Sequence, residues 1–231
     1  MDRRALLLGP LPAVVLVACG ANTQTSSSRP SDPTALAPTS AVEQATESPP
    51  PEGPVTVSLS LYVMQDDQDP AGSPLSSQRS EADLSEIAQN MSGVWAQANL
   101  VFDPITIETV QVPADVLEAV ALGLDTDPFF DQAGATFDIP NPSAVNGFYV
   151  RSAGGVNGFA PSNSRVFFVV DEPSVNDERV SSHEVGHIFG LHHQIEDPGT
   201  LMFSGTNGTV LCEDEIVVAR YNAQGVLNGV R

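Results

Sequence analysis

The chain has 231 residues, 29 of them acidic and 9 basic, so its formal net charge is −20. Such a surface repels phosphate backbones and anionic head groups, and we therefore expect no nucleic-acid partner. Cationic peptides would be attracted, although a high negative charge also serves simply to keep a protein soluble.

An export signal is predicted at the start of the chain, over residues 1–19. Two arginines precede an apolar run, from Ala5 to Val17, that is too short to span a bilayer. The run Leu16-Val17-Ala18-Cys19 resembles the lipobox of bacterial lipoproteins. This resemblance implies that Cys19 is lipidated and becomes the mature N-terminus, whereas an ordinary signal peptide with an incidental cysteine is the alternative.

Residues 20–54 are rich in Ser, Thr, Ala and Pro and contain almost no large apolar side chains. Such a segment cannot bury a core, and we expect a disordered tether. The protein is then expected to be exported as a cell-envelope lipoprotein on the extracytoplasmic side, held to the membrane by its lipid anchor. Residues 55–231 are enough for one folded domain, which we expect to be monomeric.

The first half of this domain shows one strand and one helix clearly. Residues 55–63 alternate apolar and small polar side chains, which is typical of a half-buried strand. Residues 81–98 carry apolar side chains at helical spacing, with Ser80 and Asp83 placed to form a capping box. Trp95, the only tryptophan, lies on the apolar face of this helix and is predicted to be a core residue.

An acidic loop follows the first strand. Asp66, Asp67 and Asp69 could hold Ca²⁺, although the glycine and the final glutamate of an EF-hand loop are missing. A solvated loop is the simpler interpretation.

The middle of the domain is predicted to be mostly strands. Pro104 divides a second strand or separates two short ones. A short helix over residues 114–122 precedes about twenty residues with no regular pattern. Further strands are expected over residues 147–150, 156–160 and 165–170, the last of them apolar throughout, as a central strand should be.

All four histidines lie within residues 183–193. His183 and His187 are four residues apart, so on a helix they project from one face and can share a metal ion. Glu184 lies beside them, close enough to handle a proton on a metal-bound water. On a continuing helix His193 would point away, so the chain must turn back, and Gly190 permits such a turn. His192 is a competing ligand.

The pattern H-E-x-x-H-x-x-G-x-x-H resembles that of the metzincin zinc peptidases. The resemblance implies one catalytic Zn²⁺ bound by His183, His187 and His193, with Glu184 as general base, and it favours His193 over its neighbour. Met202, nine residues after the third histidine, stands where metzincins have their Met-turn, and this short separation resembles that of matrixins.

The resemblance also implies a fold and an activity. The fold is α+β, with a twisted mixed sheet, a long N-terminal helix, an active-site helix, a Met-turn and a C-terminal helix from about residue 211. The activity is that of a zinc metalloendopeptidase, in which a metal-activated water hydrolyses peptide bonds of a protein or peptide substrate. The substrate would pair in extended form with an edge strand near Gly158, Phe159 and Ala160.

Two alternatives remain open. The chain could be a lipid-anchored binding or adhesion module that retains the fold without turnover, although the intact Glu184 argues against this. Cys212 is expected at the start of the last helix, either as a reactive thiol with a lowered pKa or as a small buried capping residue.

Overall fold

The structure, a computed structural model, describes residues 53–123, 143–162 and 164–227. The predicted export signal with Cys19, and all but the end of the predicted tether, lie outside the described residues. The irregular segment expected after the short helix also lies outside them from residue 124 onwards.

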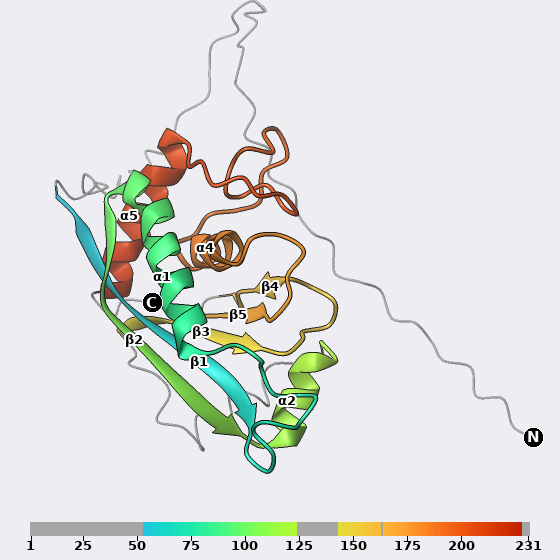
Figure 1. The fold of residues 1–231 in the computed structure, drawn as a ribbon. Helices are drawn as coiled ribbons and strands as arrows, with labels where there is room; N and C mark the ends of the chain where they lie inside the picture. Colours follow the sequence, from blue (N-terminus) through green and yellow to red (C-terminus); the bar gives the residue numbers. More distant parts are fainter. Residues whose placement is uncertain (1–52, 124–142, 163, 228–231) are drawn as a thin grey trace, which may run out of the picture. The chain divides into compact units, whose positions relative to one another are not determined.

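Five strands form one mixed sheet in the order β2-β1-β3-β5-β4 (Figure 1). Strand β1 is parallel to both β2 and β3, and β3 is parallel to β5. Strand β4 runs antiparallel to β5 at the edge of the sheet. The strands comprise Val55–Asp66 (β1), Leu100–Val112 (β2), Ala144–Val150 (β3), Gly158–Phe159 (β4) and Val166–Val170 (β5).

Several strand boundaries differ from the sequence prediction: β1 extends to Asp66, and β4 comprises only two of the five residues expected. Strand β2 continues through Pro104, because an edge strand does not need the backbone N–H that proline lacks. The register of β1 against β2 shifts at this point, between Val57 and Leu59. Strand β3 begins at Ala144, earlier than expected, and every one of its residues is buried, since it is an inner strand with a hydrophobic core on each face.

Alternating side chains of the strands fill two separate cores, one on each face of the sheet. Tyr149 and Phe167 belong to the core that also contains the apolar side chains of α1, α4 and α5. Phe148 and Phe168, one position along each strand, belong to the core formed with α2. The helices comprise Glu81–Trp95 (α1), Ala114–Ala121 (α2), Asp177–Ile188 (α4) and Glu213–Leu227 (α5). The predicted α+β architecture is therefore confirmed.

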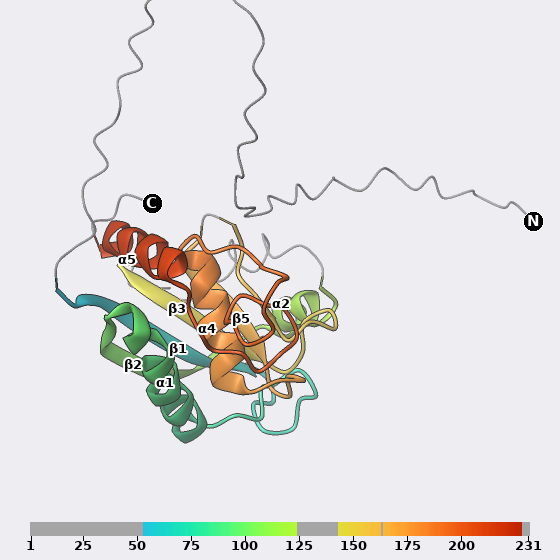
Figure 2. The ribbon, with the colours of Figure 1, turned by 90° about the horizontal axis from the view of Figure 1, so that it is seen from above.

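Helices α1 and α4 pack against each other over one face of the sheet (Figures 1 and 2). The predicted capping box opens α1: the Ser80 hydroxyl accepts from Asp83 N at 3.2 Å, and the Asp83 carboxylate accepts from Ser80 N at 2.7 Å. Trp95 is fully buried, as predicted, and its ring meets Phe189 edge to face, with centroids 5.2 Å apart. This contact ties the end of α1 to the end of α4.

The acidic loop after β1 does not assemble a calcium site. Carboxylate oxygens of Asp66 and Asp69 accept backbone N–H groups of Gln68 (2.9 Å) and Gly72 (3.0 Å), and Asp67 accepts from the Gln68 side chain. The three carboxylates thus stabilise local turns, and among the described residues only histidines gather at metal-ligand spacing. Within the same ranges, no helix has the length and apolar character needed to cross a membrane.

Candidate metal centre

Helix α4 supplies the first two histidines of the site. His183 and His187 lie one turn apart, and their rings meet edge to face with centroids 4.8 Å apart. Asn176 occupies the position before the helix, and its side chain makes no capping hydrogen bond. Asp177 and Glu178 in the first turn instead interact favourably with the positive end of the helix dipole.

Gly190 ends α4 and turns the chain back, as predicted. Its φ angle is +81°, a left-handed conformation that costs glycine little. Gly190 N donates to His187 O at 3.0 Å and Leu191 N donates to Gly186 O at 2.8 Å, which together form a Schellman motif. Asn222 of α5 donates to Phe189 O at 2.8 Å, and a Cβ at position 190 would collide with its Nδ2 atom.

This turn places the ring of His193 beside those of His183 and His187. Its Nε2 atom lies 3.0 Å from His183 Nε2 and 3.1 Å from His187 Nε2. His183 Nδ1 lies 2.8 Å from Leu201 O and His187 Nδ1 lies 3.0 Å from Leu191 O. Carbonyl oxygens only accept, so both Nδ1 atoms carry hydrogen, a tautomer assigned from these partners. The Nε2 lone pairs of both rings therefore point at the same place.

The three imidazoles fit a zinc ion by their chemistry and spacing. Zn–N bonds of about 2.0–2.1 Å at tetrahedral angles separate the nitrogens by about 3.3 Å, close to the distances found. A single hydrogen on His193 Nε2 could satisfy only one of the two facing lone pairs, whereas a cation would satisfy all three rings. His192 is exposed and lies outside the cluster, so the predicted choice of His193 agrees with the structure.

Burial keeps these rings in the neutral form that binds metal. It lowers the pKa of His183 to about 3, with smaller contributions from the neighbouring cationic forms of His187, Arg179 and His193. Burial is also the main reason that the pKa values of His187 and His193 are lowered. The ligands are therefore neutral imidazoles around neutral pH, and they need not first lose a proton from an imidazolium form to bind a cation.

Glu184 is buried between α4 and the edge strand β4. A Cβ added to Gly158 would lie 3.2 Å from Glu184 Cγ, so the strand backbone packs directly against this side chain. Burial raises the pKa of Glu184 to about 8, and the positive charge of Arg179 opposes that rise. A carboxyl group with a raised pKa holds a proton more firmly than an exposed one, which suits a general base.

The predicted edge-strand residues lie beside this carboxyl group. Gly158 and Phe159 form β4, and Ala160 directly follows it. The Phe159 ring stacks on Phe168 of β5, with centroids 4.6 Å apart, which holds the short strand in place.

Met202 lies in a turn against α4. Its side chain is fully buried, and a Cβ at Gly186 would come within 2.6 Å of its sulfur atom, so the glycine makes room for it. Met202 O accepts from Gln194 N at 3.1 Å, which links the turn to the residue after His193. The turn is thus in contact with α4, which carries His183 and His187, and with the residue that follows His193.

Two contributors to the site were missed at the sequence level. Arg179, one helical turn before His183, is buried and donates to Leu201 O at 2.9 Å and to Phe203 O. Asn222 fixes the turn at Gly190 from α5. The spacing of Arg179 from His183 was a visible signal, whereas nothing in the sequence pairs Asn222 with a turn 33 residues away.

The interpretation of Cys212 needs correction. The residue does precede α5, since Ile216 N donates to its carbonyl oxygen and its own N–H donates to the Glu215 carboxylate at 2.9 Å. Its side chain is exposed, so a buried capping role is wrong. Partial desolvation and the nearby Glu215 carboxylate raise the pKa of its thiol, the opposite of the lowering expected at a helix N-terminus.

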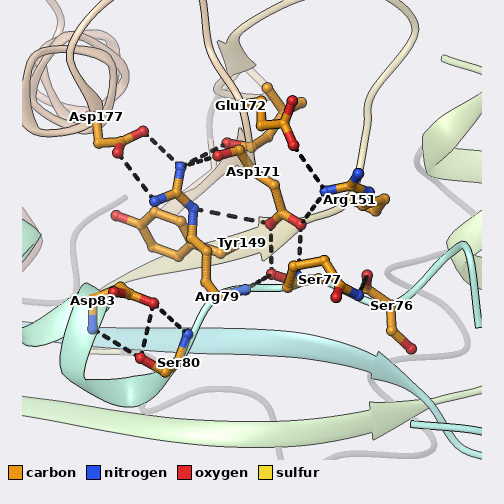
Figure 3. A network of polar contacts seen from close by, with 12 residues as sticks. Ser76, Ser77, Arg79, Ser80, Asp83, Tyr149, Arg151, Asp171, Glu172 and Asp177 are labelled. Carbon is orange, nitrogen blue, oxygen red and sulfur yellow. Dashed lines mark hydrogen bonds and ion pairs between the residues drawn. The ribbon is translucent and has the colours of Figure 1, made fainter. Parts of the chain in front are cut away.

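A polar network fixes the start of α4 (Figure 3). Arg79 donates to both carboxylate oxygens of Asp177, at 2.6 and 3.1 Å, and to the Asp171 carbonyl at 2.5 Å. The guanidinium lies over the Tyr149 ring, and Tyr149 Oη is 2.8 Å from Ser181 Oγ on α4. The segment before α1 thereby holds the end of β5 and the first turns of the histidine-bearing helix together.

Comparison with known proteins found no matching family model and no matching curated protein. Solved structures do match. They include metalloproteinase-II from Bacteroides fragilis (TM-score 0.50, 13% identity, 75% of this chain and 55% of that one). Archaemetzincin from Methanopyrus kandleri also matches, with a TM-score of 0.49 and 17% identity over 75% of this chain and 98% of that one. Mature mirolysin from Tannerella forsythia in complex with a cleaved peptide matches with a TM-score of 0.42 and 16% identity over 68% of this chain and 70% of that one. At these identities, the likeness to metalloproteinase-II concerns the fold.

Proposed function

We propose that the chain is a zinc-dependent endopeptidase. One observation carries the proposal: the Nε2 lone pairs of His183 and His187 converge on His193 Nε2, beside the buried carboxyl group of Glu184. The fold shared with metalloproteinase-II, whose name describes a metal-dependent proteinase, supports the same activity.

The residues of the chain would divide the work as follows. Zinc bound by His183, His187 and His193 would supply a Lewis acid that polarises the scissile carbonyl and lowers the pKa of a water molecule. Glu184 would take up the proton of the attacking water on its carboxylate and deliver it to the nitrogen of the leaving amine. The carbonyls of Leu201 and Leu191 would keep the first two rings in the tautomer that presents Nε2.

Edge strand β4 would align the substrate. Its outer edge has no strand partner among the described residues, so an extended peptide could add to it by backbone hydrogen bonds. Because Gly158 packs against Glu184, a peptide bound there would pass next to the general base. A protein or peptide substrate follows from this arrangement.

Replacing Glu184 by alanine tests the proposal on the full chain. We expect the parent protein to bind one zinc ion and cleave peptides, and Glu184→Ala to keep the zinc while its kcat falls by about 10²–10⁴. Metal content and peptide cleavage are measured for both proteins. Glu118→Ala, which removes an exposed carboxylate on α2, is the control and should cleave like the parent. Equal kcat values for the parent and Glu184→Ala would refute the assigned role.

A binding module without turnover is the alternative, and the same measurements separate the two. Stoichiometric zinc binding with no cleavage in a diverse peptide library would favour the module. The preserved Glu184, buried beside the ligands, argues for turnover.

We extend the proposal to the location of the protein. The lipobox-like run ending at Cys19 supports lipidation and a membrane-tethered domain outside the cytoplasm. Mass spectrometry of the mature N-terminus should find a lipid on Cys19, and Cys19→Ala should release the protein from the membrane fraction. An unmodified Cys19 in the mature protein would refute the anchor.

A further inference from the structure

Arg179 of α4 is a buried cation that forms no close ion pair in the described part of the chain, although the more distant charge of Glu184 favours its charged form. The residue is 3% exposed, and the ion pairs of the described residues do not include it. Its Nε atom has no hydrogen-bond partner. Burying a charge in this way is costly, and burial lowers the pKa of this guanidinium accordingly. Besides the charge of Glu184, the interactions that offset this cost are the hydrogen bonds of the guanidinium.

Arg179 binds two carbonyl oxygens that flank Met202. Its Nη2 atom donates to Leu201 O at 2.9 Å and also to Phe203 O. These carbonyls belong to the residues on either side of the buried methionine, so one nitrogen of the guanidinium holds the whole turn against α4. Arg179 and this turn are more than twenty residues apart in the chain, and the turn belongs to no helix or strand. The hydrogen bonds of Arg179 therefore attach it to α4.

One of these carbonyls also orients a metal ligand. Leu201 O accepts from His183 Nδ1 at 2.8 Å as well as from Arg179, using both of its lone pairs. A displaced Leu201 carbonyl would release the His183 ring to rotate or to change tautomer. Loss of a group that orients a ligand in this way typically weakens metal binding by about 10–100-fold.

We propose that Arg179 is a positioning residue of the metal centre. By binding the carbonyls on both sides of Met202, it fixes the Leu201 carbonyl that orients His183, and it fixes the turn beside the three histidines. The inference rests on the metal-binding part of the proposed function and does not depend on peptide cleavage.

The competing explanation is that Arg179 contributes only to stability, and Arg220 offers a matched control. Arg220 of α5 is also buried and also donates to backbone carbonyls, those of Ala98 at 2.7 Å and Gly53 at 2.7 Å. In the part of the chain that the structure describes, the carbonyls that Arg220 binds belong to the segments before β1 and before β2, not to the histidine cluster. Loss of either arginine should destabilise the fold, but only loss of Arg179 should disturb the metal site.

The test measures zinc affinity of the full chain by competition with a chromophoric chelator, together with the visible spectrum of the Co²⁺-loaded protein. Arg179→Met should weaken zinc binding about 10–100-fold and alter the Co²⁺ spectrum. Arg179→Lys keeps the charge, but its nitrogen is one bond closer to the backbone than Nη2. Its hydrogen bonds to the two carbonyls should therefore be weaker, and we expect zinc binding to weaken by about 2–10-fold, the contribution of about one hydrogen bond. Arg220→Met should lower the unfolding temperature and leave both metal readouts unchanged.

Each outcome decides the question. Zinc affinity and Co²⁺ spectra equal to the parent in Arg179→Met, or an equal loss of affinity in Arg220→Met, would overturn the positioning role. If circular dichroism shows that Arg179→Met does not fold, Arg179→Lys decides, and parent-like affinity in that variant would overturn it. A parent protein that binds no zinc would refute the proposed metal site, whereas a parent that binds zinc but cleaves nothing would refute only the activity.

Discussion

Replacing Gly190 by alanine tests whether the turn after α4 delivers His193 to the other two ligands. The φ angle of +81° forces an alanine into the left-handed region. The new Cβ would also collide with Asn222 Nδ2, the atom that donates to Phe189 O. The substitution therefore strains the backbone and breaks a hydrogen bond between α5 and the end of α4.

The size of the effect follows from these two contributions. Left-handed backbone costs a non-glycine residue about 1–2 kcal/mol. Leaving the buried Phe189 carbonyl without its donor costs about 1–3 kcal/mol. The free energy of unfolding should thus fall by about 2–5 kcal/mol, which lowers the unfolding temperature of a domain of this size by about 4–20 °C.

Gly205→Ala is the control for the backbone contribution. Gly205 has a φ angle of +77°, and a Cβ there would have nothing within 4 Å. We expect this variant to lose only about 1–2 kcal/mol. Thermal unfolding of the metal-free proteins and chelator competition for zinc are measured for both variants. Zinc binding should weaken at least about tenfold in Gly190→Ala, equivalent to about 1.4 kcal/mol, and stay unchanged in Gly205→Ala.

Two results would contradict this reasoning. Equal losses of stability in the two variants would show that the contact with Asn222 contributes nothing. Unchanged zinc affinity in Gly190→Ala would show that the position of His193 does not depend on the turn.

Three further predictions concern the surroundings of the site. Gly158→Ala should lower kcat/KM at least about tenfold with zinc affinity unchanged. The new methyl would lie 2.8 Å from Val180 Cγ1 and 3.2 Å from Glu184 Cγ on α4, and would push β4 away from that helix. Parent-like kinetics would disprove this. For the metal-free proteins, we compare the unfolding temperature of Glu184→Gln with that of the parent. The difference, variant minus parent, should increase as the pH rises from about 4.5 to about 8 and then level off. Over that range the folded parent holds a proton that the unfolded chain has lost, so a flat difference would contradict the raised pKa. Cys212→Ser should unfold and cleave like the parent, and a thiol reagent should label Cys212 in the folded protein, since the side chain is exposed.

The sequence by itself determined the local geometry of the site. The four-residue spacing of His183 and His187 places both rings on one side of α4, because helix geometry relates such positions without any other part of the chain. The left-handed turn at Gly190 and the capping box at Ser80 were predictable for the same reason. Their hydrogen bonds join residues a few positions apart, so the residue types alone indicate them.

Only the tertiary structure decided what surrounds this local geometry. The bond from Arg179 to the Leu201 carbonyl, the contact of Gly158 with Glu184 and the exposure of Cys212 join or separate segments distant in sequence. The same is true of the strand order that leaves β4 at the edge. Such contacts depend on how helices and strands pack, and periodicity within one segment shows which of its faces is buried without showing which partner it meets.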